Sequence, residues 1–456
     1  MSGAQAGPPV AAGFVGLATE YWNVESETGM NPAAPDVPFE HVARSLAPYG
    51  GLILRVGGDS TDWTWWPVPG MMKPPWVQWT MTPTWAAVTK RLAQDLNAHL
   101  ILGINMEAND TRIASTEIHE IQSSIGPVPI TFELGNEPEL YSHFNFYHSH
   151  SGKPVKGRPP GYSYADITSQ WNRMADALPK VRWAGPGYAS FKAQPYVGQF
   201  LDTSHRLSLL TVHSYPLKYK RCAAQTAPLN EDQLFTPASL QTLAGDLSSW
   251  TAVARPRGVG VRVDEMNSVT CGGAPVFSRT LGPALWALNI LPLYAEAGAD
   301  GVNFQNKPNS AQNLIQTTQT KAGWRVDVQP EYYGMAAFAQ LTPPGSKMLR
   351  VASVPNGLEA WAVRTPKGQE HVVVTNVTGK TVPIQIPGAR GPATVEVLKA
   401  GSGSLWAMHN VTLGGQTVDP ATGLLSGRLV TTTVHSSSGA YDVDVARNSA
   451  AIVTFR

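Results

Sequence analysis

This sequence is poor in cysteine and in net charge. Its 456 residues include two cysteines, Cys222 and Cys271, which are either unrelated thiols or one disulfide of an exported protein. The formal net charge is +1, so no overall field draws the protein to nucleic acid or to a membrane surface. No stretch reaches the roughly 20 apolar residues of a membrane span. The N-terminus lacks an apolar signal core, which leaves a cytosolic protein or an exported one whose signal was removed.

Several motifs of metal and nucleotide chemistry are also absent. The sequence has no His-Glu-x-x-His motif, no Gly-x-Ser-x-Gly elbow, no Walker loop and no dinucleotide fingerprint. We therefore expect no metal and no cofactor.

Short apolar strands alternate with amphipathic helices over residues 13–340. One helix pattern places Val88, Leu92 and Leu96 at i+4 spacing. Near-continuous apolar strands alternating with helices indicate a parallel sheet buried on both faces, and eight such units predict a (β/α)8 TIM barrel of the α/β class. The predicted strands are 14–20, 52–57, 100–105, 130–136, 181–185, 207–214, 260–265 and 301–305.

The pattern changes after a helix-like segment at 331–341. Short alternating runs, separated by Gly, Pro and Asn turns, predict an accessory antiparallel β-sandwich domain with a supporting role. We place the catalytic barrel at 13–340 and the β-sandwich at 341–456, which could also recruit a strand from 1–12. The predicted strands are 358–364, 371–376, 394–398, 406–413, 441–445 and 451–455.

Two glutamates end apolar strands of the predicted barrel. Glu137 lies in the segment ITFELGNEP at 130–138, and Glu265 ends the segment VRVDE at 261–265. An unpaired buried carboxylate is costly, so each is either salt-bridged for structural reasons or used in chemistry. The fourth and seventh strands face each other across a barrel, where two carboxyl groups about 5–5.5 Å apart suit glycoside hydrolysis by double displacement.

The two glutamates are expected to have different roles. Glu265 should be the ionised nucleophile, and Glu137 the acid that protonates the leaving oxygen. A nearby anion such as Glu265 helps an acid to keep its proton until it is used. Pro138 is expected to push Glu137 into an extended backbone conformation.

Together these motifs resemble the heparanase and β-glucuronidase family, glycoside hydrolase family 79. The main segments are FELGNEP at 132–138 and Glu265 followed by CGGAP at 271–275. The resemblance implies a retaining enzyme that cleaves β-linked D-glucuronic acid. The interpretation that we prefer is an exo-acting β-glucuronidase. The alternative is an endo-acting heparanase that cuts heparan sulfate chains. Supporting segments in the same order are LRVGG at 54–58, LGIN at 102–105, GP at 185–186, HSY at 213–215 and Gln305.

The resemblance also implies residues that bind the sugar. Asn136 would hold the 2-hydroxyl, and Tyr215 would donate a hydrogen bond to the nucleophile. Backbone N–H groups at Cys271, Gly272 and Gly273 would bind the C6 carboxylate, because glycine lets the backbone approach closely. The remaining contacts to ring hydroxyls are expected from Glu20, Asp59 and Gln305.

The chain departs from the family at residues 270 and 271. Thr270 and Cys271 stand where the human-type heparanase has tyrosine and glycine, so a side-chain contact to the carboxylate is missing there. Replacement contacts could come from Lys307, Tyr332 or Tyr333. Cys271 and Cys222 follow neighbouring predicted strands, and we expect a disulfide between them that holds the glycine loop.

Two further patterns lie on the predicted active-site side. Tryptophans crowd the segment after the second strand; we expect most to pack a long loop, with Trp63 or Trp65 the candidates for sugar contact. Two basic runs, 153–158 and 218–221, are either scattered surface charge or suited to a sulfated or uronate-rich chain.

Two rival functions remain open at this point. A barrel that binds glycans without turnover is disfavoured by the intact pair Glu137 and Glu265. An arabinofuranosidase or xylosidase of a neighbouring family would act on neutral sugars instead. For the preferred function we expect a monomeric, secreted or periplasmic enzyme whose partner is a glucuronic-acid-containing glycoside or glycosaminoglycan.

Overall fold

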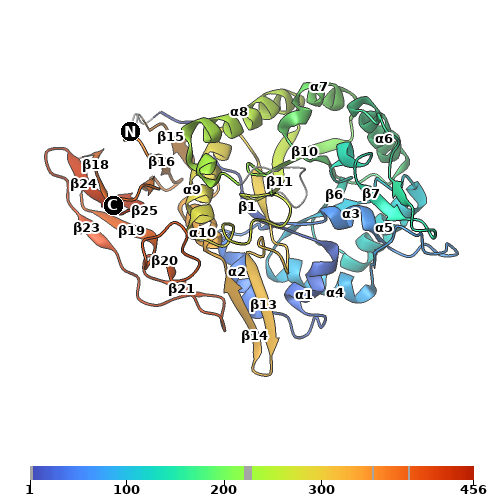
Figure 1. Cartoon of the computed structure of the whole chain (residues 1–456), viewed down its shortest axis with the longest axis horizontal. Helices are drawn as coiled ribbons and strands as arrows, with labels where there is room; N and C mark the ends of the chain where they lie inside the picture. The colour runs from blue at the N-terminus through green and yellow to red at the C-terminus, as the bar shows by residue number, and fades with distance from the viewer. Residues whose placement is uncertain (1–3, 220–228, 352–353, 389–390, 456) are drawn as a thin grey trace.

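A closed barrel of eight parallel strands forms the larger part of the protein (Figure 1). The computed structural model describes residues 4–219, 229–351, 354–388 and 391–455. The barrel and its strand segments confirm the predicted fold, although the fifth strand continues to Tyr188. The strands, in chain order, are β1 (Val15–Thr19), β2 (Ile53–Val56), β5 (His99–Ile104), β6 (Ile130–Leu134), β9 (Trp183–Tyr188), β10 (Leu207–Ser214), β11 (Gly260–Met266) and β12 (Gly301–Gln305).

Helices follow the barrel strands and surround them. Their inward faces carry the apolar residues of the main core, such as Ile118 and Ile121, while the strands are buried on both sides. No helix within the described ranges is long and apolar enough to cross a bilayer. The surrounding helices are α2 (Val37–Ser45), α4 (Pro83–Asp95), α5 (Thr111–Ile125), α6 (Tyr164–Ala177), α7 (Gln194–Thr203), α8 (Pro237–Ala254), α9 (Leu281–Glu296) and α10 (Pro330–Leu341).

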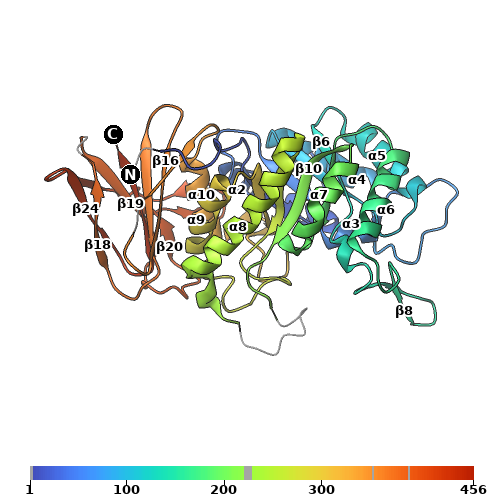
Figure 2. The same ribbon diagram turned by 90° about the horizontal axis from the view of Figure 1, so that it is seen from above.

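Loops at the C-terminal ends of the strands carry hairpins that the sequence pattern did not predict. One hairpin, β7 (Asn145–His148) with β8 (Pro154–Lys156), follows β6, and another, β13 (Ile315–Thr320) with β14 (Gly323–Val328), follows β12 (Figures 1 and 2). These strands are absent from the predicted set; β7 and β8 have only four and three residues.

The tryptophan-rich segment supports the β7–β8 hairpin. Trp76 stacks on Phe146 of β7 with ring centroids 5.4 Å apart and planes 16° apart, and Trp65 is buried in the same small cluster. Trp63 donates from its indole N–H to the carbonyl oxygen of Phe146 at 3.0 Å. Trp63, Trp65 and Trp76 therefore pack this loop, whereas Trp66 and Trp85 of the same segment belong to the main core.

The C-terminal region is built from antiparallel strands. A large sheet has the order β15 (Lys347–Leu349), β16 (Leu358–Arg364), β17 (Glu370–Asn376), β25 (Ser449–Phe455), β19 (Ala393–Ala400) and β20 (Val411–Leu413), with β23 (Thr432–Val434) also paired to β19. A second sheet pairs β18 (Val382–Pro387) with β24 (Ala440–Val445). The predicted strand at 406–413 begins only at Val411, because residues 401–410 form turns.

The large sheet is buried on both faces. Alternate residues of β17 point to opposite sides: Val373 joins the main core, whereas Val372 and Val374 join a separate core that includes Tyr441 of β24. The first face packs on α9, a helix whose residues are almost all buried, as expected for a helix that is apolar on every side. Figure 2 shows the sheet standing beside α9 and α10.

The N-terminal segment runs along the edge of this sheet. Ala6 donates its N–H to Met348 O at 2.8 Å, and Val10 donates to Ser346 O at 2.8 Å. The barrel and the β region are thus joined by backbone hydrogen bonds as well as by the apolar contact with α9.

Candidate active site

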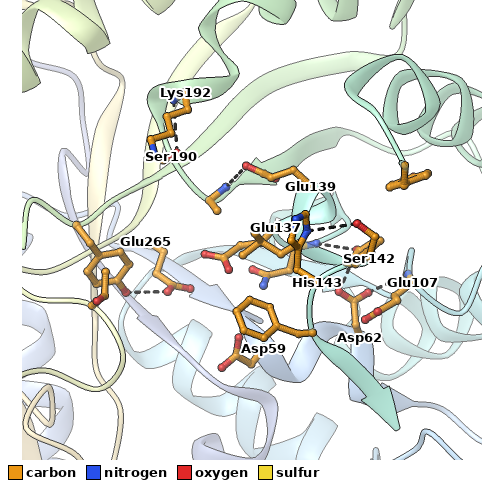
Figure 3. Close-up of a pocket in the computed structure, with 18 of the residues that line it drawn as sticks. Asp59, Asp62, Glu107, Glu137, Glu139, Ser142, His143, Ser190, Lys192 and Glu265 are labelled. Carbon is orange, nitrogen blue, oxygen red and sulfur yellow. Dashed lines mark hydrogen bonds between the residues drawn. The ribbon is translucent and has the colours of Figure 1, made fainter. Parts of the chain in front are cut away.

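A large cavity lies at the C-terminal ends of the barrel strands. It has a volume of about 1290 Å³, and both Glu137 and Glu265 line it. Figure 3 shows their carboxyl groups directed into the same space, with Asp59 below them. Of the sugar-binding residues that the resemblance implies, seven also line this cavity: Glu20, Asp59, Asn136, Tyr215, Cys271, Gly272 and Gln305.

A buried arginine is the centre of the charged groups beneath the cavity. Arg55 of β2 has no solvent exposure; its Nε lies 2.8 Å from Glu133 and 3.1 Å from Asp264, and its Nη1 lies 2.7 Å from Glu265 Oε2. Although burial opposes ionisation of Glu133, Arg55 lowers the pKa of this residue. Burial and the charge of Glu133 raise the pKa of Asp264 well above its ordinary value, and the two carboxyl groups are hydrogen-bonded. Asp264 is therefore the partner that holds the proton.

An irregular register allows two consecutive acids of β11 to approach the same arginine. In a regular strand Asp264 and Glu265 would point to opposite faces. The pairing of β10 with β11 shifts between Val212 and His213, and the pairing of β11 with β12 shifts between Val263 and Met266. Such bulges re-aim side chains next to functional sites.

Glu265 is held as a carboxylate. Tyr215 donates its hydroxyl to Glu265 Oε1 at 2.7 Å, while Arg55 binds the other oxygen. Burial works against the charge, but His213, Arg55, the bond from Tyr215 and Lys307 together lower the pKa of Glu265 to about 2. A carboxylate in this state is a competent nucleophile at neutral pH.

Glu137 is the more accessible glutamate and has a histidine partner. Its side chain is 25% exposed, against 13% for Glu265. His213 Nδ1 lies 2.7 Å from Glu137 Oε1. Burial disfavours the charged imidazole, but the charge of Glu265 and the hydrogen bond to Glu137 raise the pKa of His213 to about 10. His213 thus connects the two glutamates electrostatically.

The backbone of Glu137 corrects one expectation. The proline rule predicts an extended conformation, but Glu137 has φ 48° and ψ 49° in the left-handed region. Its N–H donates to Gly187 O at 2.8 Å, and its carbonyl accepts from Leu140 N–H, which starts the short helix Pro138–Leu140. These bonds offset a strain of about 1–2 kcal/mol, and strained residues of this kind cluster at functional sites.

Charged and polar groups from β1, β2 and β12 line one half of the cavity. Glu20 accepts from Ser60 N–H at 2.8 Å and from the Gln305 amide at 3.4 Å. Burial, with Asp59 and Glu265 adding to it and Lys307 opposing it, raises the pKa of Glu20 to about 7. Lys307 Nζ lies 3.3 Å from Asp59 and 3.9 Å from Glu20. We call this set the glycone half: Glu20, Asp59, Gln305 and Lys307.

A second buried network supports Asn136. Arg55 donates to Asn136 Oδ1 at 2.9 Å, and the Asn136 N–H donates to Tyr141 Oη at 3.3 Å. Tyr141 in turn donates to Asp62 at 3.0 Å. Our sequence reasoning missed Asp62 and Tyr141, as well as Glu133 and Asp264 below Arg55; acidic residues inside apolar strands were the available signal for the latter pair.

The glycine loop offers fewer free donors than expected. The Gly273 N–H donates to Thr270 O at 3.0 Å and is therefore not free for a substrate carboxylate. Gly273 does not appear in the cavity lining, where Thr270, Cys271 and Gly272 do. Cys271 is disulfide-bonded; its predicted partner, Cys222, lies outside the described residues.

Several other candidates lie elsewhere. Tyr332 and Tyr333 are buried in α10, where Tyr332 contacts Ser45 and Tyr333 accepts from the Val418 N–H, so neither can bind a sugar carboxylate. Trp65 is buried away from the cavity, whereas Trp63 lines it.

The basic runs divide between surface, structure and cavity. Arg158 is used in the structure, because it donates to the carbonyl oxygens of Glu107 and Met106. Lys218 lines the cavity, and Lys220 and Arg221 lie outside the described residues. In the described part of the chain, no three His, Cys, Asp or Glu side chains are grouped to hold a metal ion.

Comparison with solved structures shows that several glycoside hydrolases have the same fold as this chain. The sequence matches no protein-family model and no curated protein. A 4-O-α-L-rhamnosyl-β-D-glucuronidase from Fusarium oxysporum is similar over 99% of this chain and 97% of its own, with 15% identity and a TM-score of 0.73. An arabinofuranosidase of glycoside hydrolase family 51 from Xanthomonas axonopodis pv. citri covers 99% and 98%, with 12% identity and a TM-score of 0.66. A family 30 xylanase from Clostridium acetobutylicum covers 99% and 98%, with 11% identity and a TM-score of 0.55.

Proposed function

We propose that this protein is a retaining glycoside hydrolase that cleaves β-linked D-glucuronic acid by double displacement. The observation that carries the proposal is the pair of glutamates in one cavity, of which Glu265 is kept ionised and Glu137 is open to the cavity. The same pair argues against a barrel that only binds glycans, since the nucleophile's partners Arg55 and Tyr215 would otherwise have no use.

The reaction uses the two glutamates in turn. Glu265 attacks the anomeric carbon while Glu137 gives its proton to the leaving oxygen, so that a covalent glycosyl-enzyme forms. When the glycosyl ester forms, Glu265 loses its negative charge. That charge is one of the causes that raise the pKa of His213, the histidine beside Glu137. Glu137, now a carboxylate, takes a proton from water, which attacks the anomeric carbon and restores Glu265.

Lys307 is the proposed partner of the C6 carboxylate. It lines the glycone half of the cavity, and its side chain is one-third exposed. Burial opposes the charge, but Asp59, Glu20 and Glu265 raise the pKa of Lys307, so it is cationic whenever a glucuronate is present. This assignment replaces the missing side-chain contact at Thr270. The similarity to a solved glucuronidase supports the same choice of sugar.

An exo mode of action is part of the proposal. The ion pair between Lys307 and Asp59 connects the segment after β12 with the segment after β2. Because β1 lies between these two strands in the barrel, the ion pair lies beside Glu20 at the end of β1. A barrier there favours removal of a terminal residue over cleavage within a heparan sulfate chain.

Export from the cytosol is also proposed. The disulfide at Cys271 borders the cavity, and structural disulfides persist in oxidising compartments. We therefore propose a secreted or periplasmic enzyme acting as a monomer.

One observation favours a neutral sugar as the second candidate. Lys307 already has two carboxyl groups beside it, Glu20 and Asp59, and such acceptors also suit the hydroxyls of an arabinofuranoside or xyloside. Solved structures with this fold include an arabinofuranosidase and a xylanase.

A panel of aryl glycosides separates these candidates. We expect kcat/KM for 4-nitrophenyl β-D-glucuronide to exceed that for the α-L-arabinofuranoside and β-D-xyloside on the order of 10²-fold, because a site that pairs with a carboxylate rejects substrates that lack it. Proton NMR of the first-formed product should show the β-anomer. Preference for a neutral pentoside, or release of the α-anomer from the glucuronide, would contradict the proposal.

A further inference from the structure

The cavity is larger than the glycone half requires. Its volume of about 1290 Å³ exceeds the roughly 300–1,000 Å³ of pockets that enclose drug-sized ligands. More than half of the residues that line it come from two segments, 139–165 and 189–199, which lie after β6 and β9. A single sugar ring over Glu265 would leave this part empty.

The position of these two segments in the barrel indicates which part of the substrate they would contact. Around the barrel, β6 and β9 lie opposite β12 and β1, whose ends carry Gln305 and Glu20 of the glycone half. Glu137 follows β6 and is the proposed donor of the proton to the leaving oxygen. The leaving group must therefore extend from Glu137 into the half that the two segments line, which we call the leaving-group half.

Two exposed aromatic residues stand in the leaving-group half. Phe144 is 55% exposed and Tyr196 is 43% exposed, and both line the cavity. Exposed aromatic faces of this size are unfavourable in water, and they are the surfaces on which sugar rings commonly stack.

The Tyr196 ring and the backbone that carries Phe144 are both held before any ligand binds. Tyr196 lies parallel to Tyr164, with centroids 4.2 Å apart and planes 13° apart. The Phe144 N–H donates to Leu140 O, and the β7–β8 hairpin that begins next to it is fixed by the stack of Phe146 on Trp76. A preorganised surface loses little entropy when a ligand binds.

We propose that Phe144 and Tyr196 form a subsite for a sugar ring in the leaving group, so that the substrate is an oligosaccharide or polysaccharide ending in glucuronic acid. This inference rests on the proposed function and narrows it, because glucuronides of small alcohols would leave the subsite empty. The surrounding residues are rich in hydrogen-bonding groups, which suit a sugar better than an apolar aglycone: Ser142, Asn145, Ser190, Lys192 and Gln199 also line this half.

The test compares two substrates that differ only in the leaving group. A disaccharide with β-linked glucuronic acid on a hexose fills the subsite, whereas β-D-glucuronyl fluoride leaves it empty. For Phe144→Ala and Tyr196→Ala we expect kcat/KM on the disaccharide to fall about 10-fold each, as for the loss of one stacking contact, with the fluoride rate within about twofold of wild type. Tyr196→Phe keeps the ring and should keep the activity.

A matched control lies on the far side of the barrel. Tyr49 is 53% exposed, lines a small cavity beside Gly13 and Phe14 and is distant from the glutamates in the fold, so Tyr49→Ala should leave both rates unchanged. Equal losses on both substrates, or no loss on the disaccharide, would overturn the subsite. A larger loss on an aryl glucuronide than on the disaccharide would overturn its assignment to a sugar. If wild-type protein hydrolyses neither the fluoride nor the disaccharide, the proposed function fails, and the subsite with it.

Discussion

The mouth of the barrel and the C-terminal β region differ in where their charged side chains lie. Beneath the cavity, Arg55 is surrounded by Glu133, Asp264 and Glu265, and none of these side chains is more than 13% exposed. In the β region, the ion pair of Arg364 with Glu370 lies at the surface end of a hairpin, with the arginine side chain 39% exposed.

This difference indicates where the proposed chemistry would lower the stability of the fold. A surface ion pair contributes about 0–1 kcal/mol, whereas burying several charges together is often less stable than an apolar core of the same size. The β region uses apolar alternation throughout its core, as a supporting structure can. The barrel departs from that rule at the ends of the strands that carry Glu137 and Glu265.

The sharpest way to test the comparison is the same substitution in both regions. Glu265→Gln should lower kcat on an aryl β-glucuronide on the order of 10⁴-fold or more, because the amide cannot act as the nucleophile. Glu370→Gln should leave kcat unchanged. Steady-state rates of both variants, with thermal melts to show that they fold, give the answer. Undiminished hydrolysis by Glu265→Gln would refute the mechanism.

A smaller effect is expected from a pair of tyrosines. Tyr215 donates to Glu265 at 2.7 Å, and Tyr441 in the β region donates to Gly391 O at 2.8 Å. Tyr215→Phe should reduce kcat about 10²-fold, as for the loss of one donor to a reacting group. Tyr441→Phe should cost about 1 kcal/mol of stability without affecting kcat. If both variants lose only stability, Tyr215 has no part in the chemistry.

The smallest expected effect is a dependence of stability on pH. Burial, together with the charge of Asp62 in the case of Glu107, raises the pKa of Glu27 to about 8 and of Glu107 to about 9. Between their unfolded pKa, near 4.5, and these values the folded protein binds more protons than the unfolded chain. The stability they contribute is thus full below about pH 4.5 and is lost as the pH rises through 8 to 9. We expect the Tm to fall by about 5 °C from pH 6 to pH 9.

One buried histidine of the β region, His371, should give the opposite dependence of stability on pH. Burial lowers the pKa of His371 to about 4, so its contribution is present above its unfolded pKa of about 6.5 and is lost as the pH falls towards 4. Melts of Glu27→Gln should show a weaker dependence above pH 6, and melts of His371→Gln a weaker one below it. A Tm that rises from pH 6 to pH 9 would contradict the account of the buried carboxyls.

The fold could be predicted from the sequence because its signals are local. Apolar strands such as those ending at Gln305 and Ser214 are buried on both sides and repeat at regular intervals, which indicates a barrel without knowledge of contacts. The resemblance in sequence motifs pointed to Tyr215 beside Glu265, and these residues lie within hydrogen-bond distance.

The finer geometry of the site depends on contacts between distant residues. The left-handed conformation of Glu137 opposes the rule for residues before proline and is held by Gly187, from another strand. Asp264 and Glu265 approach Arg55 together only because of irregular strand register, which no periodic pattern reveals. The hairpin β7–β8 escaped prediction because its apolar contact, Trp76, comes from a loop far away in the chain.

Helix α9 has a consequence for any attempt to shorten the protein. One side of it closes the barrel and the other accepts residues of the large sheet, among them Trp361 and Val373. A fragment ending near residue 340 would expose this second side of α9 to water as a large apolar surface. We therefore expect that the barrel cannot be produced as a soluble fragment without the β region.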